Sequence, residues 1–167
     1  MQLIKTLILF LALISCAGAE TGVAKVLRVS DGDTITLDID DQKVRCRLYG
    51  IDAPEKKQPY GEDSRRYLMQ MVLGKDVGYE IKGTDMYHRS ICVLSIVTPQ
   101  GEKVVNEQML EMGMAWAYVQ YLKKDRADLK NYLELQTSAM KKKIGLWQDS
   151  NPQAPWEYRR ANKRRRR

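Results

Sequence analysis

Two alternating runs of residues on either side of a short polar turn constrain the fold most. In residues 34–39 every second side chain is apolar, and residues 43–49 alternate in the same way. The residues between the two runs, 40–42, are polar. An alternation with a period of two is typical of a half-buried strand, and two such runs around a short turn predict a β-hairpin.

Further extended and helical segments complete the pattern. Runs rich in β-branched residues predict three more strands, over residues 23–29, 76–82 and 89–97. Apolar residues at helical spacing predict three helices: one that ends at Gly74, one over 104–112 and one over 125–143. Five strands with a helix after the third, followed by helices, predict an α+β, mainly β fold. We expect a five-stranded barrel of the oligonucleotide/oligosaccharide-binding (OB) type packed with three helices.

Residues 1–19 differ from the rest of the chain. A positively charged start precedes an apolar run over residues 6–15, which is too short to span a bilayer. The Ala-Gly-Ala sequence at 17–19 fits the cleavage site of a signal peptide, so we expect an exported protein, periplasmic or secreted, that begins near Glu20. The residues up to Cys16 also resemble a bacterial lipobox, and lipidation of Cys16 would instead anchor the protein to a membrane.

The net charge of +7 comes from the C-terminal end of the chain. Of the 28 Lys and Arg residues, seven lie in residues 159–167, where there is no acidic residue, so the remaining 21 balance the 21 Asp and Glu residues. This balance excludes a uniformly basic domain of the histone-like kind. We expect a flexible basic tail over residues 151–167. The tail either adds affinity for a polyanion or is only a solubilising end.

Two cysteines, Cys46 and Cys92, remain after cleavage of a signal peptide. An even pair in an oxidising compartment is consistent with a disulfide. Both residues lie in apolar strand-like runs, so two buried free thiols are an equal alternative.

Three short polar segments provide candidate chemistry: residues 31–34, 47–55 and 85–89. Their Asp and Glu side chains offer the oxygen ligands that a hard cation such as Ca²⁺ prefers. Their two arginines present planar donor groups that match phosphate oxygens. A cation, a carboxylate base and guanidinium groups are the parts needed for attack of water on a phosphodiester.

In this order the three segments resemble the signatures of the staphylococcal nuclease (thermonuclease) family: Asp31-Gly-Asp-Thr34, Arg47-x-x-x-x-Asp52-x-Pro-Glu55 and Asp85-x-Tyr-x-Arg89. The similarity continues through 104–107, 113–115, 117–119 and 145–147 and covers about residues 23–149, within a domain of residues 20–150. The resemblance implies a barrel with three helices and calcium-dependent hydrolysis of DNA and RNA. Cleavage would have little sequence specificity and would leave 3′-phosphate ends.

The resemblance also implies roles for individual residues. The Ca²⁺ ligands would be Asp33, Asp52 and the backbone carbonyl of Ala53. The catalytic residues would be Glu55 as the general base, with Arg47 and Arg89 on the phosphate. Residues that line the nucleotide pocket would be Tyr87, Tyr118 and Tyr121. Asp31 is expected to shape its turn rather than to bind metal.

The chain departs from the family pattern at two positions. His88 stands where the family commonly has glycine, which is less favourable if the site needs a positive φ. Met86 replaces the lysine that usually precedes the tyrosine. The alternative to an enzyme is a catalytically weak nucleic-acid-binding module of the same fold. In either case we expect a monomer without a stable protein partner, and contact with a membrane only if Cys16 is lipidated.

Overall fold

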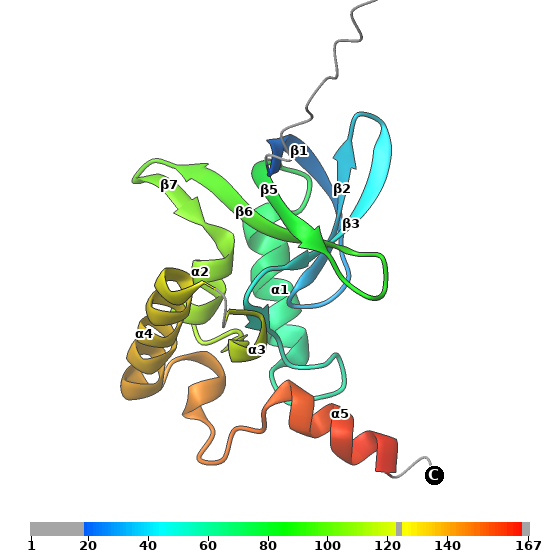
Figure 1. Ribbon diagram of the computed structural model, residues 1–167. Coiled ribbons are helices and arrows are strands. Elements are labelled where there is room, and N and C mark those ends of the chain that lie inside the picture. The colour runs from blue at the N-terminus through cyan, green and yellow to red at the C-terminus, as the bar shows by residue number, and fades with distance from the viewer. Residues whose placement is uncertain (1–18, 123–124, 165–167) are drawn as a thin grey trace, which may run out of the picture.

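The predicted hairpin is part of a closed β-barrel (Figure 1). In the computed structural model, which describes residues 19–122 and 125–164, β2 (Thr34–Ile39) and β3 (Gln42–Leu48) pair antiparallel, with Ile35 opposite Cys46. Ile35, Leu37, Cys46 and Leu48 are buried, as the alternation predicts.

Three further strands complete the barrel: β1 (Glu20–Val29), β5 (Asp76–Thr84) and β6 (Ser90–Thr98). Neighbouring strands in the order β3-β2-β1-β5-β6 are antiparallel, and β3 and β6 then pair parallel, with Leu48 opposite Cys92, to close the sheet. The sheet continues beyond the barrel through β7 (Gly101–Val104). A separate short pair consists of β4 (Ile51–Asp52) and β8 (Trp116–Ala117).

The helices lie below the barrel in the view of Figure 1. They are α1 (Gly61–Val72), α2 (Val105–Glu111), α3 (Val119–Leu122), α4 (Arg126–Lys142), the 3₁₀ turn η1 (Gly145–Gln148) and α5 (Pro155–Arg164). Helix α1 contributes Leu68 and Val72 to the barrel core. The side chain of Asp125 caps α4 by accepting hydrogen bonds from the backbone amides of Ala127 and Asp128, each at 3.1 Å. The OB-type barrel and the three predicted helices, observed as α1, α2 and α4, are thus confirmed.

Helix α5 corrects the prediction of a flexible tail over residues 151–167. Pro155 begins the helix, where its fixed φ is favourable and its missing N–H costs nothing. Trp156 packs edge-on against Trp116 and stacks on Tyr118, with ring centroids 5.6 and 5.7 Å apart. These aromatic contacts order the segment despite its basic residues. Residues 165–167 lie outside the described residues, as do residues 1–18, so the signal peptide and the lipidation of Cys16 stay predictions.

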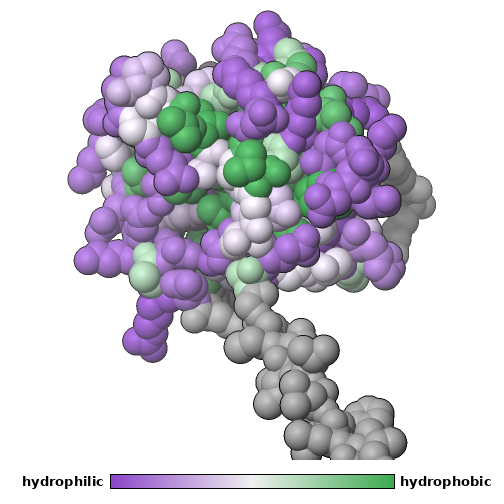
Figure 2. Space-filling view, turned by 90° about the horizontal axis from the view of Figure 1, so that it is seen from above, coloured by the Kyte–Doolittle hydropathy of each residue, from purple (hydrophilic) through white to green (hydrophobic). Residues whose placement is uncertain are grey.

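One face of the molecule is largely hydrophilic. Figure 2 shows small hydrophobic patches among hydrophilic side chains on the face seen from above. Among the helices of residues 19–122 and 125–164, none has the length and apolar composition needed to span a membrane.

Cys46 on β3 and Cys92 on β6 form a disulfide, which decides between the two states that the sequence left open. Both residues are fully buried. The bond joins the two strands whose parallel pairing closes the barrel, so it crosslinks the fold at its closure point.

Replacing both cysteines, Cys46→Ala with Cys92→Ala, is expected to lower the free energy of unfolding by about 4 kcal/mol. The bond closes a loop with a sequence separation of 46 residues, and the unfolded chain regains that freedom without it. Urea unfolding of the oxidised wild type and the double variant measures the difference.

A reducing agent supplies the control. It should move the unfolding midpoint of the wild type toward that of the double variant and leave the variant unchanged. If the reductant does not change the unfolding midpoint of the wild type, the disulfide does not stabilise the fold.

Candidate active site

The turn between β1 and β2 forms the floor of the candidate site. Asp31 accepts a hydrogen bond from the backbone amide of Asp33 at 3.1 Å, the turn-shaping contact that the sequence led us to expect. Gly32 lies against α1, where an added Cβ would come within 1.9 Å of the Ser64 hydroxyl oxygen. Only glycine allows this approach, which brings Asp33 close to Ala53: the backbone amide of Ala53 donates to Asp33 Oδ2 at 2.8 Å.

Arg47 connects two buried carboxylates. Its Nη1 donates to Asp33 Oδ1, and its Nη2 donates to Asp52 Oδ1 at 2.7 Å. The side chain of Asp52 is 0% exposed and that of Arg47 is 12% exposed. Removing the guanidinium would leave the buried Asp33 carboxylate without an ion-pair partner and Asp52 with Arg159 alone, and breaking a buried pair costs roughly 3–5 kcal/mol. Arg47 therefore stabilises the fold, and its role in the chemistry stays a prediction.

The site carries an excess of negative charge. Asp31, Asp33, Asp52 and Glu55 provide four carboxylates. Arg47 and one further arginine on α5 pair with three of them, Asp33, Asp52 and Glu55, and the charge of Arg89 is balanced by Asp85. Burial raises the pKa of Asp31 to about 6, and the nearby Asp33 carboxylate adds to the increase.

The pKa values of Asp52 and Arg47 also reflect opposing effects of burial and of neighbouring charges. Burial also raises the pKa of Asp52, an effect that hydrogen bonds from Arg159 and the charge of Arg47 only partly offset. Although burial by itself lowers the pKa of Arg47, the carboxylates of Asp33 and Asp52 raise it above its ordinary value.

These oxygen donors fit a hard divalent cation. Two buried carboxylates, Asp33 and Asp52, lie on either side of one guanidinium in a site that is rich in negative charge. Within residues 19–122 and 125–164 there is no group of three or more His, Cys, Asp and Glu side chains arranged to hold a metal ion. A cation here would rely on fewer carboxylates together with backbone carbonyl and solvent oxygens, and the use of the Ala53 carbonyl stays a prediction.

Arg89 lies at the rim of the site and is held there by Asp85. The Asp85 carboxylate accepts from Arg89 Nε at 2.8 Å and Arg89 Nη2 at 2.6 Å, and also from the backbone amides of Tyr87 and Arg89. Burial alone raises the pKa of Asp85, but these hydrogen bonds hold it below its ordinary value. The loop includes His88 with a φ of 57°, so the position where the family commonly has glycine does use the left-handed conformation.

Aromatic side chains form one wall. The rings of Tyr118 and Tyr121 lie 4.8 Å apart, and the Tyr118 hydroxyl donates to Gln120 at 3.2 Å. On the Arg89 side, Tyr87 is exposed and its ring centroid lies 5.5 Å from the Arg89 guanidinium carbon. Such exposed rings offer faces on which nucleotide bases can stack.

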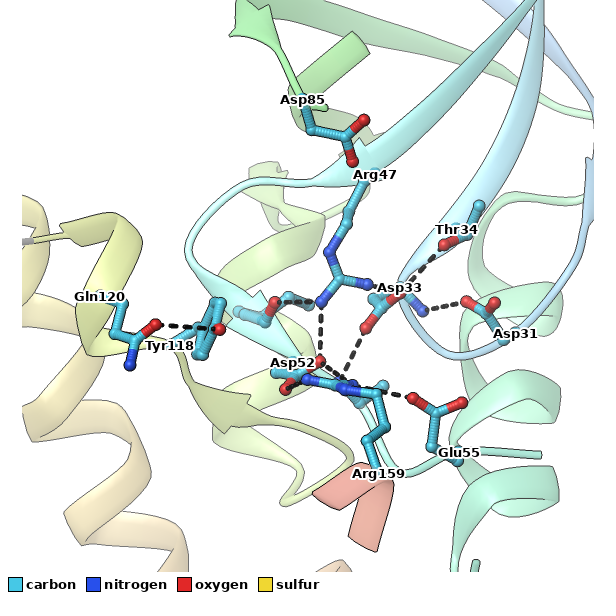
Figure 3. A network of polar contacts seen from close by, with 12 residues as sticks. Asp31, Asp33, Thr34, Arg47, Asp52, Glu55, Asp85, Tyr118, Gln120 and Arg159 are labelled. Atoms are coloured by element: carbon cyan, nitrogen blue, oxygen red, sulfur yellow. Dashed lines mark hydrogen bonds and ion pairs between the residues drawn. The ribbon is translucent and has the colours of Figure 1, made fainter. Parts of the chain in front are cut away.

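A cleft of about 360 Å³ brings these residues together. It is lined by all of the predicted site residues except Asp52, namely Asp33, Arg47, Ala53, Glu55, Tyr87, Arg89, Tyr118 and Tyr121. Asp52 lies buried and contacts Arg47 directly (Figure 3). The three polar segments of the sequence thus converge on one cleft, and the individual roles predicted for their residues stay predictions.

Two residues of the site were missed in the sequence. Asp85 stood inside the third signature, but nothing in the one-dimensional pattern showed that it orients Arg89. Arg159 also lines the cleft and donates to Asp52 and Glu55. Pro155, followed by an aromatic residue, was the available signal for the start of a helix. The basic residues of 159–167 led instead to the prediction of a flexible tail.

Comparison with known proteins gives consistent matches. The sequence model of the family described as "Staphylococcal nuclease homologue" matches residues 45–149. An uncharacterized endonuclease of Haemophilus influenzae is 38% identical over 162 residues, which cover 96% of this chain and 86% of that protein. A micrococcal nuclease of Shigella flexneri is 37% identical over 144 residues, or 83% and 81% of the two chains. A staphylococcal-like nuclease of Arabidopsis thaliana is 44% identical over 123 residues, 74% of this chain but 35% of that longer protein.

The change Asp85→Asn is expected to lower the free energy of unfolding at neutral pH by about 1–3 kcal/mol, because charge-assisted hydrogen bonds are lost. A carboxylate with a lowered pKa stabilises the fold above its unfolded-state pKa, and this contribution disappears as the pH falls through the folded-state value. The difference between wild type and variant should therefore shrink below about pH 4. Urea unfolding at neutral pH and near pH 3 measures it.

Asp41→Asn is the matched control, since Asp41 is exposed in the turn between β2 and β3 and has a φ of 61°, which asparagine tolerates. A difference for Asp85→Asn that stays constant with pH would contradict the assignment.

Proposed function

The chain belongs to the staphylococcal nuclease family, and from that premise we propose that it is a calcium-dependent endonuclease that hydrolyses the phosphodiester bonds of DNA and RNA with little sequence specificity. The observation that carries the proposal is the single cleft in which buried carboxylates, guanidinium groups and a solvent-accessible glutamate lie together. These are the groups that attack of water on a phosphodiester requires.

Asp33, Asp52 and the backbone carbonyl of Ala53 would hold the cation. When bound there, Ca²⁺ supplies Lewis-acid polarisation of a phosphoryl oxygen. The surrounding negative charge supports this assignment, because a divalent cation would neutralise the carboxylates that Arg47 and Arg159 leave uncompensated.

The side chains of the chain itself account for the proton and charge movements. Glu55 is half-exposed at the edge of the cleft, where it can accept a proton from an attacking water molecule. Arg47 and Arg89 stabilise the negative charge that develops on the phosphate oxygens. Loss of the 5′ oxygen as the leaving group would leave a 3′-phosphate end.

The proposed range of substrates, DNA and RNA, follows from the types of side chain that line the cleft. Tyr87 and Tyr121 are exposed and present ring faces, whereas Tyr118 lines the cleft with Trp156 stacked on its ring. Stacking on a ring tolerates any base. The arginines can bind the backbone phosphate, which DNA and RNA share. Such a cleft favours cleavage of both nucleic acids, and the proposed enzyme acts as a monomer. A catalytically weak binding module remains the alternative function, and it is an outcome of the cleavage assay below.

Export of the enzyme is also part of the proposal. The sequence of residues 1–19 supports cleavage before Glu20, with lipidation of Cys16 as the alternative route. The buried Cys46–Cys92 disulfide supports an oxidising compartment such as the periplasm or the cell exterior.

Incubation with plasmid DNA or single-stranded RNA is expected to give cleavage in Ca²⁺ and none in EDTA. Glu55→Gln should reduce the rate by about 100- to 1,000-fold, because the amide cannot accept the proton. Glu102→Gln, at an exposed position on β7, is the control and should keep the wild-type rate. Cleavage that persists in EDTA, or in full with Glu55→Gln, would contradict the mechanism. Binding without cleavage would favour the binding module.

Expression of the full chain in a bacterial host should yield an exported protein whose first residue is Glu20. Cell fractionation and mass spectrometry of the N-terminus test this. A lipid on Cys16 would indicate the lipoprotein route, and a variant without residues 1–19 should stay in the cytoplasm. An uncleaved chain in the cytoplasm would contradict export.

A further inference from the structure

Helix α5 is docked beside the candidate active site by contacts of its first residues and of the two residues before it. The side-chain amide of Gln58 donates to the carbonyl of Gln153 at 2.5 Å, and the Tyr158 hydroxyl donates to the carbonyl of Lys57 at 3.2 Å. Ala154 and Pro155 are buried, and Trp156 stacks on Tyr118. These contacts determine where the next turn of the helix, with Arg159, must lie.

Arg159 occupies the oxygens of two predicted functional carboxylates. Its Nη2 donates to Asp52 Oδ2 at 2.7 Å, and its Nη1 donates to Asp52 Oδ1 at 3.1 Å and to Glu55 Oε1 at 2.8 Å. In Figure 3, Arg47 and Arg159 approach Asp52 from opposite sides, so that Asp52 lies between two guanidinium groups. Asp52 is thereby paired on both of its oxygens.

A guanidinium and a divalent cation have the same requirement at these carboxylates. Each is stabilised by the negative charge and the lone pairs of the carboxylate oxygens. Asp52 Oδ1 accepts from both guanidinium groups and Oδ2 accepts from Arg159. A cation on Asp52 would therefore meet the positive charge of Arg159 at close range, and this repulsion favours withdrawal of the arginine. Its contact with Glu55 engages the proposed general base in the same way.

The contact is also suited to being broken. The side chain of Arg159 is 41% exposed, so it can leave toward solvent without disturbing the core. A cleft of about 520 Å³ lies beside it and gives the side chain room to move. Water reduces the net free energy of an ion pair that would be strong if it were buried.

We propose that Arg159 is an intramolecular competitor of the catalytic cation: it pairs with Asp52 and Glu55 in the cation-free protein and is displaced when the cation binds. This inference rests on the proposed function, since it takes the cation and the general base from there. It gives the C-terminal basic segment a role that neither nonspecific affinity nor solubility describes. Cation binding and release of Arg159 are then coupled by linkage.

Calorimetric titration with Ca²⁺, in the absence of nucleic acid, tests the competition. Arg159→Gln should bind Ca²⁺ about tenfold more tightly than the wild type, because the binding-competent state no longer has to be populated against the docked arginine. Arg160→Gln is the matched control: it removes the same charge from the next position of α5, where the side chain is exposed and has no ion pair with any residue in the described part of the chain. Its Ca²⁺ affinity should stay within about twofold of the wild type.

A spectroscopic readout reports on the arginine itself. In protein with isotope-labelled arginine, the side-chain N–H signal that Arg159→Gln removes belongs to Arg159, and Ca²⁺ should shift it toward the position of a solvated arginine. An Arg159 signal that does not respond to bound Ca²⁺ would overturn the inference.

The titration separates this inference from the proposed function. Equal Ca²⁺ affinity in all three proteins, with calcium-dependent cleavage intact, would overturn the competition alone. An equal gain in Arg159→Gln and Arg160→Gln would also overturn it, since the effect would then be one of general charge. If neither the wild type nor Arg159→Gln binds Ca²⁺, both the competition and the calcium site of the proposed function are wrong.

Discussion

The bridge that Arg47 makes between Asp33 and Asp52 is the interaction on which the rest of the site depends. Two carboxylates this deeply buried would repel each other and lose their hydration, so they need a shared counter-charge. The same bridge ties the turn between β1 and β2 to the end of β3 and to β4. Fold and site therefore use one set of ion pairs, and the barrel cannot close around Arg47 without assembling the cleft.

Competition for carboxylate oxygens is the recurring theme around this bridge. Arg47 lies at the end of the barrel strand β3 with most of its side chain buried. Arg159 reaches the site from helix α5 near the end of the chain and is much more exposed. Arg89 is different again, because Asp85 holds it at the rim without contact to the buried pair. The exposed member is the one that a small cation can replace at low cost, since water can solvate a guanidinium near the surface.

Much of the fold and of the site could be predicted from local pattern. The alternation in residues 34–39 and 43–49 predicted β2 and β3 because side chains of a half-buried strand face the core at every second position. The three signatures predicted which residues would meet in the cleft. Asp85 and Arg159 were missed for a common reason: each acts by orienting or pairing with another site residue, through side-chain contacts that appear only in three dimensions. For α5, the aromatic packing of Trp156 outweighed the repulsion that a run of basic residues suggests.

The sequence by itself determined the five barrel strands, helices α1, α2 and α4, the near-neutral charge of the body and most of the residues in the cleft, because these depend on periodicity, composition and short motifs. Only the tertiary structure decided that Cys46 and Cys92 are bonded, since two cysteines 46 residues apart form a disulfide only if the strands that carry them become neighbours. It also decided that the basic end of the chain is in part a docked helix. The position of Arg159 depends on packing between segments more than one hundred residues apart, and no local pattern encodes a contact of that range.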